Sequence, residues 1–152
     1  MNKNIIQFIQ LQTCATICCV DSDKYPYCFC CYYVFNKENY SLSFKSAEDS
    51  FHSILLAKNP VVSGTIIPDK LNKLIVKGIQ FTGEFIIENE PAVKNAAKKY
   101  YFKFPAALGI KGTIYTIQIN SIKMTDSSSI FGKKIVWSRM ENTVLPNAEL
   151  IE

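Results

Sequence analysis

The chain lacks long apolar runs, and neither positive nor negative charge is in large excess. The longest continuous apolar run, residues 26–35, is about half the length needed to span a membrane, so no transmembrane helix is predicted. Gln7, Gln10 and Gln12 interrupt the N-terminal segment, which is typical of an amphipathic helix rather than a secretory signal. The net charge of +4 is mild and forms no long basic stripe, so nucleic acid is not an expected partner. We therefore expect a cytoplasmic protein.

The sequence also lacks the motifs of several enzyme classes. It contains no Gly-x-Ser-x-Gly, no glycine-rich phosphate loop and no His-Glu metal motif. Glu84, Glu88 and Glu90 lie at a predicted strand end and in the loop after it, which does not indicate acid–base catalysis. A bound cofactor would therefore have to supply any redox chemistry, and the sequence does not identify a substrate.

Six cysteines lie between Cys14 and Cys31, in two β-like runs. On strands, Cys28 and Cys30 share a face and Cys31 points the other way. Because the spacing forms no zinc knuckle and the single histidine lies outside the cluster, we expect no metal. The favoured interpretation is a set of small, reduced side chains that pack a barrel wall. A metal site and regulated thiol chemistry are the alternatives.

With 152 residues, of which 48% are hydrophobic and 20% charged, the chain is expected to form a single domain, residues 1–152. Gly78 and Gly83 interrupt a long alternating segment and predict bends or bulges. The expected elements are a helix at 3–12, strands at 14–20, 27–35 and 40–45, a helix at 47–59, strands at 61–67 and 74–87, a helix at 91–104, and strands at 113–123 and 134–138.

The segment 40–64 contains the most informative pattern. An alternating strand runs into a capping box, Ser46 to Asp49, which predicts a helix from Ala47. Phe51, Ile54 and Leu55 form the apolar stripe of this helix, and Asn59-Pro60 ends it. A valine-rich strand follows.

Short connections between six or more strands predict an antiparallel barrel with added helices. The strand at 27–35 is apolar on both faces. One face can fill the barrel, and the other needs a cover. We therefore expect a homodimer.

This layout resembles the FMN-binding split β-barrel superfamily, the fold of the pyridoxamine 5'-phosphate oxidases, over nearly the whole chain. The closest likeness is to its uncharacterised YhbP-like branch. The residues that carry the likeness are Ser50 to His52, Gly64-Thr65, Gly78 to Phe81, Gly83-Glu84, Phe104-Pro105, Lys123, Thr125-Asp126, Phe131 to Lys134, and Trp137.

The resemblance implies a mainly β, Greek-key split barrel that forms a homodimer with two flavin sites at the subunit interface. By position, Ser46, Ser50 and His52 match residues that face the FMN phosphate. Lys73 falls near a position that contacts the flavin ring. The resemblance also implies further contacts from the partner's C-terminal part, for which Lys133, Lys134 and Trp137 are the candidates.

The chain departs from the family where the oxidases usually carry an Arg-Lys pair, because it has Phe51-His52. Phe51 is expected in the core. His52 is either a phosphate donor or a polar histidine on the helix surface. Lys133 and Lys134 either reach across the dimer or form a solvated pair.

The expected function is that of an FMN-binding protein, a small flavin-dependent oxidoreductase of unknown substrate. The alternative is a non-catalytic split barrel: a flavin carrier, a haem-handling relative, or a barrel that has lost its cofactor. The Phe51-His52 departure predicts weak retention of FMN.

Overall fold

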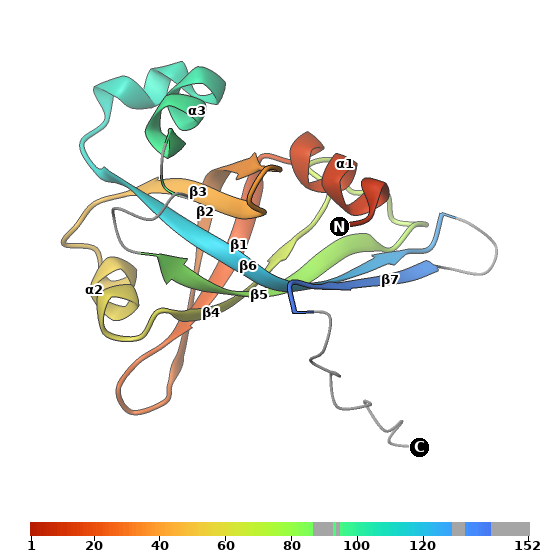
Figure 1. The fold of residues 1–152 in the computed structure, drawn as a ribbon, viewed down its shortest axis with the longest axis horizontal. Coiled ribbons are helices and arrows are strands. Elements are labelled where there is room, and N and C mark those ends of the chain that lie inside the picture. The colour runs from red at the N-terminus through yellow and green to blue at the C-terminus, as the bar shows by residue number, and fades with distance from the viewer. Residues whose placement is uncertain (87–92, 94, 129–132, 141–152) are drawn as a thin grey trace.

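The computed structural model describes residues 1–86, 93, 95–128 and 133–140. Figure 1 shows a β-barrel with helices at its ends. The elements are α1 (Lys3–Leu11), β1 (Cys14–Val20), β2 (Pro26–Asn36), β3 (Ser41–Ser46), α2 (Phe51–Lys58), β4 (Val61–Ile66), β5 (Lys77–Ile86), α3 (Ala96–Lys103), η1 (Pro105–Gly109), β6 (Thr113–Asp126) and β7 (Lys133–Ser138).

The predicted antiparallel barrel is confirmed. The strands follow the order β3-β2-β1-β4-β5-β6-β7, and an additional pairing of β3 with β6 closes the first six into a barrel. The 14-residue strand β6 makes this possible, because its first part pairs with β3 and its last part with β7. The register shifts between Thr82 and Gly83, so the bulge predicted at Gly83 is present.

Inward-facing side chains of all six barrel strands form one core, and α1 closes one end of it. This helix buries Ile5, Phe8 and Ile9, which are between 0% and 4% exposed. Its polar face turns outward, as the amphipathic pattern predicts. Ile17, Leu42, Phe44, Ile66, Ile117, Ile119, Ile122 and Met124 are among the strand residues with almost no exposed surface.

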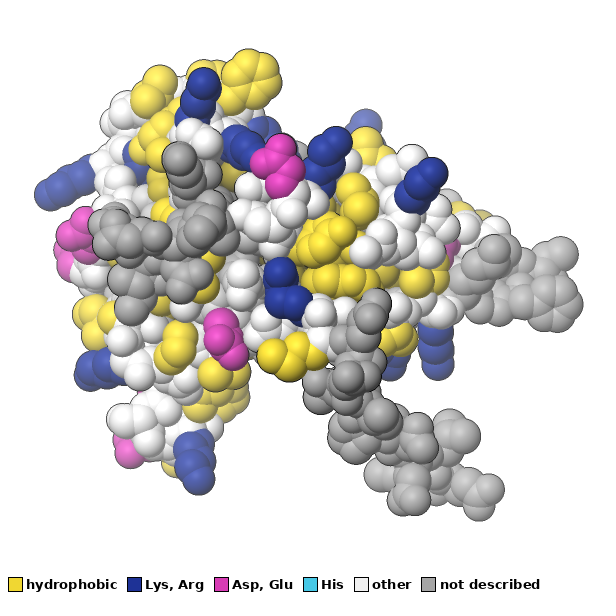
Figure 2. All heavy atoms as spheres, in the orientation of Figure 1, with side chains coloured by type: hydrophobic (Ala, Val, Ile, Leu, Met, Phe, Trp, Pro, Cys, Tyr) yellow, Lys and Arg dark blue, Asp and Glu magenta, His cyan; other side chains and the backbone are white. Residues whose placement is uncertain are grey.

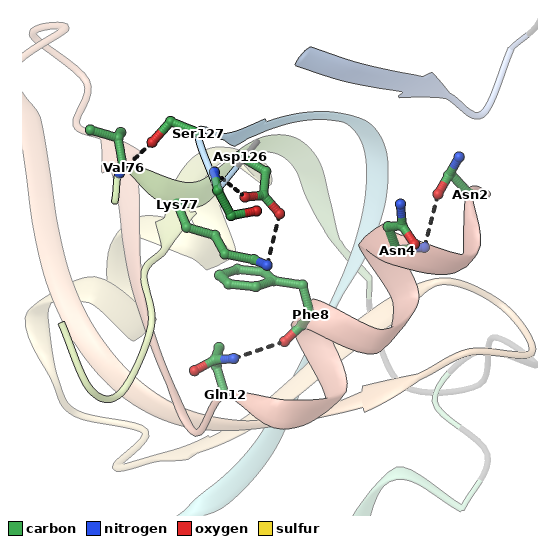
Figure 3. A network of polar contacts seen from close by, with 9 residues as sticks. Asn2, Asn4, Phe8, Gln12, Val76, Lys77, Asp126 and Ser127 are labelled. Atoms are coloured by element: carbon green, nitrogen blue, oxygen red, sulfur yellow. Dashed lines mark hydrogen bonds and ion pairs between the residues drawn. The ribbon is translucent and has the colours of Figure 1, made fainter. Parts of the chain in front are cut away.

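Polar contacts fix α1 and the neighbouring strand ends (Figure 3). Asn2 caps the helix by accepting from the Asn4 backbone N–H at 2.8 Å, and the Gln12 amide donates to the Phe8 carbonyl at 3.2 Å. Lys77 pairs with Asp126 at 2.7 Å beside the Phe8 ring. The hydrogen bond from Lys77 lowers the pKa of Asp126 to about 2.

The predicted start of the second helix is wrong. The helix begins at Phe51, and Ser50 is its N-cap, accepting from the Ser53 N–H. Residues 47–50 form a turn instead. The hydroxyls of Ser46 and Ser50 bond to each other at 3.1 Å, and this local pairing competes with helix formation.

The prediction that Phe51 belongs to the core is also wrong. Its side chain is 53% exposed and that of Ile54 is 44% exposed, whereas Leu55 and Leu56 are buried. Leu55 and Leu56 face the barrel, so the buried stripe is displaced from the predicted one by about a quarter turn. The Phe51 ring instead lies against Tyr27 of β2, with centroids 5.0 Å apart.

The other boundaries agree closely with the prediction, with three exceptions. β5 begins at Lys77 rather than at residue 74, and β6 continues to Asp126. The helix predicted at 91–104 starts later than expected: Val93 and Asn95 lie in turns and α3 spans Ala96–Lys103, while residues 91, 92 and 94 lie outside the described part. No helix in the described ranges is long and apolar enough to cross a membrane. On the face of the molecule that Figure 2 shows, the Lys and Arg side chains are spread out, with Asp and Glu among them, rather than gathered in one stripe.

The cysteines follow the predicted faces but not the predicted chemistry. Cys31 lies on the inner side of β2, and Cys28 and Cys30 are exposed on the outer side. Cys18 and Cys28 form a disulfide, with Cα atoms 4.2 Å apart, so the expectation of six reduced thiols is wrong. These two residues lie opposite each other in the β1–β2 register. A strand pattern by itself does not fix register.

Candidate functional site

Three predicted phosphate-site residues come together where β3 ends and α2 begins. The Ser46 hydroxyl lies 2.6 Å from His52 Nε2, and the Ser50 hydroxyl lies 3.1 Å from the same nitrogen. Ser53, which the sequence analysis did not select, lies 2.7 Å from the Ser50 hydroxyl and donates to the Ala47 carbonyl at 2.8 Å. We call Ser46, Ser50, His52 and Ser53 the serine–histidine cluster.

Aromatic packing holds the His52 ring in place. The ring stacks on Phe29 of β2, with centroids 3.9 Å apart and planes 12° from parallel. Burial lowers the pKa of His52, so the imidazole is mainly neutral at neutral pH. A neutral imidazole has one donor and one acceptor nitrogen, and Nε2 is the one that faces the hydroxyls. His52 therefore brings a directed hydrogen-bonding group to the cluster.

A groove of about 490 Å³ lies beside the cluster, lined by Ala47, Glu48, Asp49, Lys111, Gly112 and Thr113. Gly112 has φ of +143° and passes so near β3 that an added Cβ would lie 2.7 Å from the Ser46 carbonyl oxygen. This close approach places Lys111 next to the groove. No sequence motif indicated Lys111. Lys111 comes just before Thr113 in the sequence, and Thr113 pairs with Ser46. The position of Lys111 beside the groove therefore follows from this pairing and not from a local pattern.

Two acidic residues share this groove with Lys111. Thr113 donates its hydroxyl hydrogen bond to Glu48 at 2.5 Å, and Asp49 lies in the turn before α2. The N-terminus of α2 favours an anion through its backbone N–H groups. The groove therefore offers hydrogen-bond donors and the positive charge of Lys111 to an anionic ligand, whereas the carboxylates of Glu48 and Asp49 repel such a ligand.

The remaining predicted residues lie elsewhere in the protomer. Lys73 is exposed in the β4–β5 connection, just before β5 begins opposite Asp126, whereas Ser46 pairs with Thr113 at the other end of β6. Lys134 is exposed on β7.

Trp137 packs edge-on against Tyr40, with centroids 5.0 Å apart. The side chain of Lys133 lies outside the described part of the structure. One protomer therefore does not bring Lys73, Lys134 or Trp137 to the serine–histidine cluster, and contacts from a partner stay a prediction.

No metal centre is indicated in the described residues, where no three His, Cys, Asp or Glu side chains gather. Burial raises the pKa of the Cys31 thiol, and the neighbouring Cys14 and Cys30 add to this effect. Cys31 is thus a protonated wall residue, as the sequence analysis favoured.

Sequence comparison relates this chain to bacterial proteins named only as UPF0306. The UPF0306 protein of Photorhabdus laumondii is 35% identical over 135 residues, which cover 89% of this chain and 94% of the relative. That of Yersinia pestis is 32% identical over 137 residues, covering 90% and 92%. No family model matches the chain.

Solved structures share the fold at low sequence identity. A haem-binding protein from Mycobacterium smegmatis matches with a TM-score of 0.72 at 10% identity, covering 86% of this chain but 55% of the other. A FAD-binding protein from Mesorhizobium loti gives 0.66 at 14% identity, with 84% and 96% covered. HutZ, a haem storage protein from Vibrio cholerae, gives 0.59 at 16%, with 76% and 86% covered. The shared fold is the split β-barrel.

Proposed function

This chain belongs to the UPF0306 family, and we propose that it binds FMN as a cytoplasmic homodimer. It acts as a small flavin-dependent oxidoreductase. Its place is in the YhbP-like branch of the pyridoxamine 5'-phosphate oxidase-like superfamily. The observation that carries the proposal is the serine–histidine cluster. Ser46, Ser50 and His52 lie within 3.1 Å of one another at the start of a helix.

The chemistry of the cluster suits a phosphate group. Its hydroxyls and imidazole bond to one another, and each can turn to donate to a phosphate oxygen instead. The N-terminus of α2 adds backbone donors, and Lys111 adds a positive charge beside the groove. Glu48 and Asp49 weaken the attraction, so the affinity for FMN is expected to be low enough for the cofactor to be lost on purification.

When bound, FMN supplies the redox chemistry of its ring. This chain's own residues would hold the phosphate through Ser46, Ser50 and His52 and orient the cofactor. Phe29 stacks on one face of the His52 ring and covers that side of the imidazole. Lys73, Lys133, Lys134 and Trp137 are candidates for further contacts from a second subunit.

An exposed apolar patch supports the homodimer. Tyr32 of β2 is 62% exposed, and Ile67 and Leu71 of the β4–β5 connection are 55% and 72% exposed. These three side chains line one groove of about 430 Å³. A second copy that covers the patch would bury more than about 2,000 Å² in an obligate dimer. A folded monomer at micromolar concentration, measured by light scattering, would refute this assembly.

The test of FMN binding is titration of the purified protein with FMN and with riboflavin, which has no phosphate. We expect micromolar binding of FMN and weaker binding of riboflavin. Ser46→Ala and Ser50→Ala should each weaken FMN by about fivefold to tenfold, since each removes a hydrogen bond, and leave riboflavin unchanged. Equal affinity for the two flavins would show that no phosphate site exists here.

A non-catalytic barrel is the second candidate, favoured by the fold shared with haem-binding proteins. The chain has one histidine to offer as a haem ligand, His52. A haem titration that gave a Soret band lost in His52→Ala would favour haem handling. FMN binding without reductase activity towards any electron donor would favour a flavin carrier.

A further inference from the structure

The disulfide joins β1 and β2 at the point where their hairpin leaves the barrel. β1 pairs with β4 over Thr16–Cys18, so Cys18 occupies the last of these rungs. Beyond the disulfide the β1–β2 hairpin continues as a two-stranded ribbon that projects past the barrel, as Figure 1 shows below α2. Because a two-stranded ribbon is marginally stable by itself, the Cys18–Cys28 bond fastens its base.

The neighbours of Cys28 connect this bond to the cluster. Tyr27 and Phe29 lie on either side of Cys28 in the sequence, and their rings point to the opposite face of β2. The Tyr27 ring contacts Phe51 at 5.0 Å, and the Phe29 ring stacks on His52 at 3.9 Å. The strand segment that the disulfide anchors is therefore the one that holds the first two residues of α2.

The disulfide is also open to reagents. Cys28 is exposed and Cys18 is half-buried. The apolar patch expected to face a partner surrounds Tyr32, farther from the hairpin tip than Cys28. Disulfides in the cytosol are uncommon and usually transient, catalytic or redox-sensing, so in a cytoplasmic protein this bond is expected to cycle.

We propose that Cys18 and Cys28 form a reversible thiol–disulfide site that exchanges with small thiols such as glutathione, and that its oxidised state tightens the serine–histidine cluster for its ligand. The second part rests on the proposed function. A small thiolate attacks Cys28 Sγ, the Cys18–Cys28 bond breaks, and Cys18 leaves as a thiolate that takes up a proton.

A second small thiol then attacks the mixed disulfide at the small-molecule sulfur, releasing a small-molecule disulfide and the Cys28 thiol. The protein disulfide gains two electrons and two protons, and two small thiols are oxidised. Reduction releases the base of the ribbon, and the contacts of Tyr27 and Phe29 with α2 loosen.

The first experiment measures exchange itself, without any cofactor. The protein is equilibrated in buffers of reduced and oxidised glutathione, alkylated, and digested for mass spectrometry. We expect Cys18 and Cys28 to change state together, while Cys30, which is exposed and on the same face, acts as the internal comparison. Failure of the pair to oxidise in any of these buffers would overturn the proposal.

The second experiment follows the coupling through His52, again without a cofactor. The chain has a single histidine, so a protein made without a histidine tag gives one imidazole C–H resonance set in NMR. Loss of stacking on Phe29 should shift these resonances on reduction. Cys30→Ser should respond like the wild type, and Cys18→Ser/Cys28→Ser should resemble the reduced protein and ignore reductant. Unchanged resonances would refute the coupling.

The third experiment is FMN titration of the oxidised and reduced forms. We expect reduction to weaken FMN by about tenfold, the size of one aromatic packing contact, with the double variant fixed at the weaker value. Equal FMN affinity in both forms would refute redox control of the site. If neither form binds FMN, the proposed function fails, and the glutathione and NMR measurements still decide the exchange site and its coupling.

Discussion

The two ends of the barrel use polar side chains in opposite ways. At the end closed by α1, polar groups from different elements bond to one another. Lys77 of β5 pairs with Asp126 of β6, and Gln12 accepts from the Asp69 backbone N–H at 2.8 Å. At the end beside α2, Ser46, Ser50, His52 and Ser53 bond within one short segment. The first arrangement joins elements, and the second gathers donors that a ligand can use.

The titratable groups at the two ends of the barrel also differ in their effect on the fold. The pKa of Asp126 is lowered by the hydrogen bond from Lys77, so this carboxylate stabilises the fold as an ion. The pKa of His52 is lowered by burial, so protonation of this imidazole opposes the fold. A phosphate beside His52 would reverse that preference, because an anion favours the charged imidazole. Substitutions at the first end should therefore change stability, and substitutions at the second should change binding.

The largest effect is expected at the α1 end. Ile9 is 0% exposed, so Ile9→Ala removes a buried side chain and leaves a cavity. We expect the free energy of unfolding to fall by about 2–5 kcal/mol, measured by urea denaturation, with FMN affinity of the folded protein unchanged. Leu11→Ala is the matched control, since Leu11 is 75% exposed and its loss should change stability by less than about 0.5 kcal/mol. Equal effects of the two would mean that α1 does not close the core.

The next effect is expected at the α2 end. His52→Lys places a full positive charge beside the hydroxyls, and a charge-assisted bond to phosphate is worth about 1.5–3 kcal/mol. FMN should bind roughly tenfold to a hundredfold more tightly, and riboflavin should not respond. Lys58→Ala, at the far end of the same helix, is the control. If titration gives the same FMN affinity for wild type and His52→Lys, His52 does not face the phosphate.

A smaller effect is expected for Asp126→Asn, about 1 kcal/mol of stability near neutral pH, because the ion pair is only partly buried. The carboxylate has a folded-state pKa of about 2 against 3.8. Its contribution is therefore present above about pH 4 and is lost as the pH falls towards 2. Urea midpoints of the two proteins should converge over this window. A constant difference would show that Lys77 does not hold the carboxylate ionised.

The smallest effect is expected for the pH dependence of His52. Because burial lowers its pKa below the ordinary 6.5, the unfolded chain binds the proton more readily than the folded chain. The contribution of neutral His52 is complete above pH 6.5 and declines as the pH falls through that value. The melting temperature of the wild type should drop slightly more than that of His52→Gln on acidification, and added FMN should reverse the difference. A larger drop for the variant would contradict the assigned pKa direction.

Local pattern was enough to predict most elements of this chain. The boundaries of β1, Cys14–Val20, follow from its alternation, and the amphipathic pattern around Ile5 and Ile9 predicted α1. The serines of the site could also be selected, because Ser46 and Ser50 are close in sequence and need little tertiary information to meet. The start of α2 was mispredicted, since a hydroxyl network and a capping box have the same residue types.

The features that the sequence alone left open all depend on the register between paired strands. The Cys18–Cys28 pair exists because the hairpin aligns these two positions, and Lys111 reaches the groove because Thr113 pairs with Ser46. Periodicity within a strand tells which face a side chain takes, but not which residue of another strand lies opposite it. The sequence thus determined the alternation, the buried face of α1 and the hydroxyl cluster. The register of the β1–β2 hairpin decided the disulfide, and the pairing of β3 with β6 that closes the barrel decided the position of the nearby cation, because the alternation within one strand does not set its pairing with another.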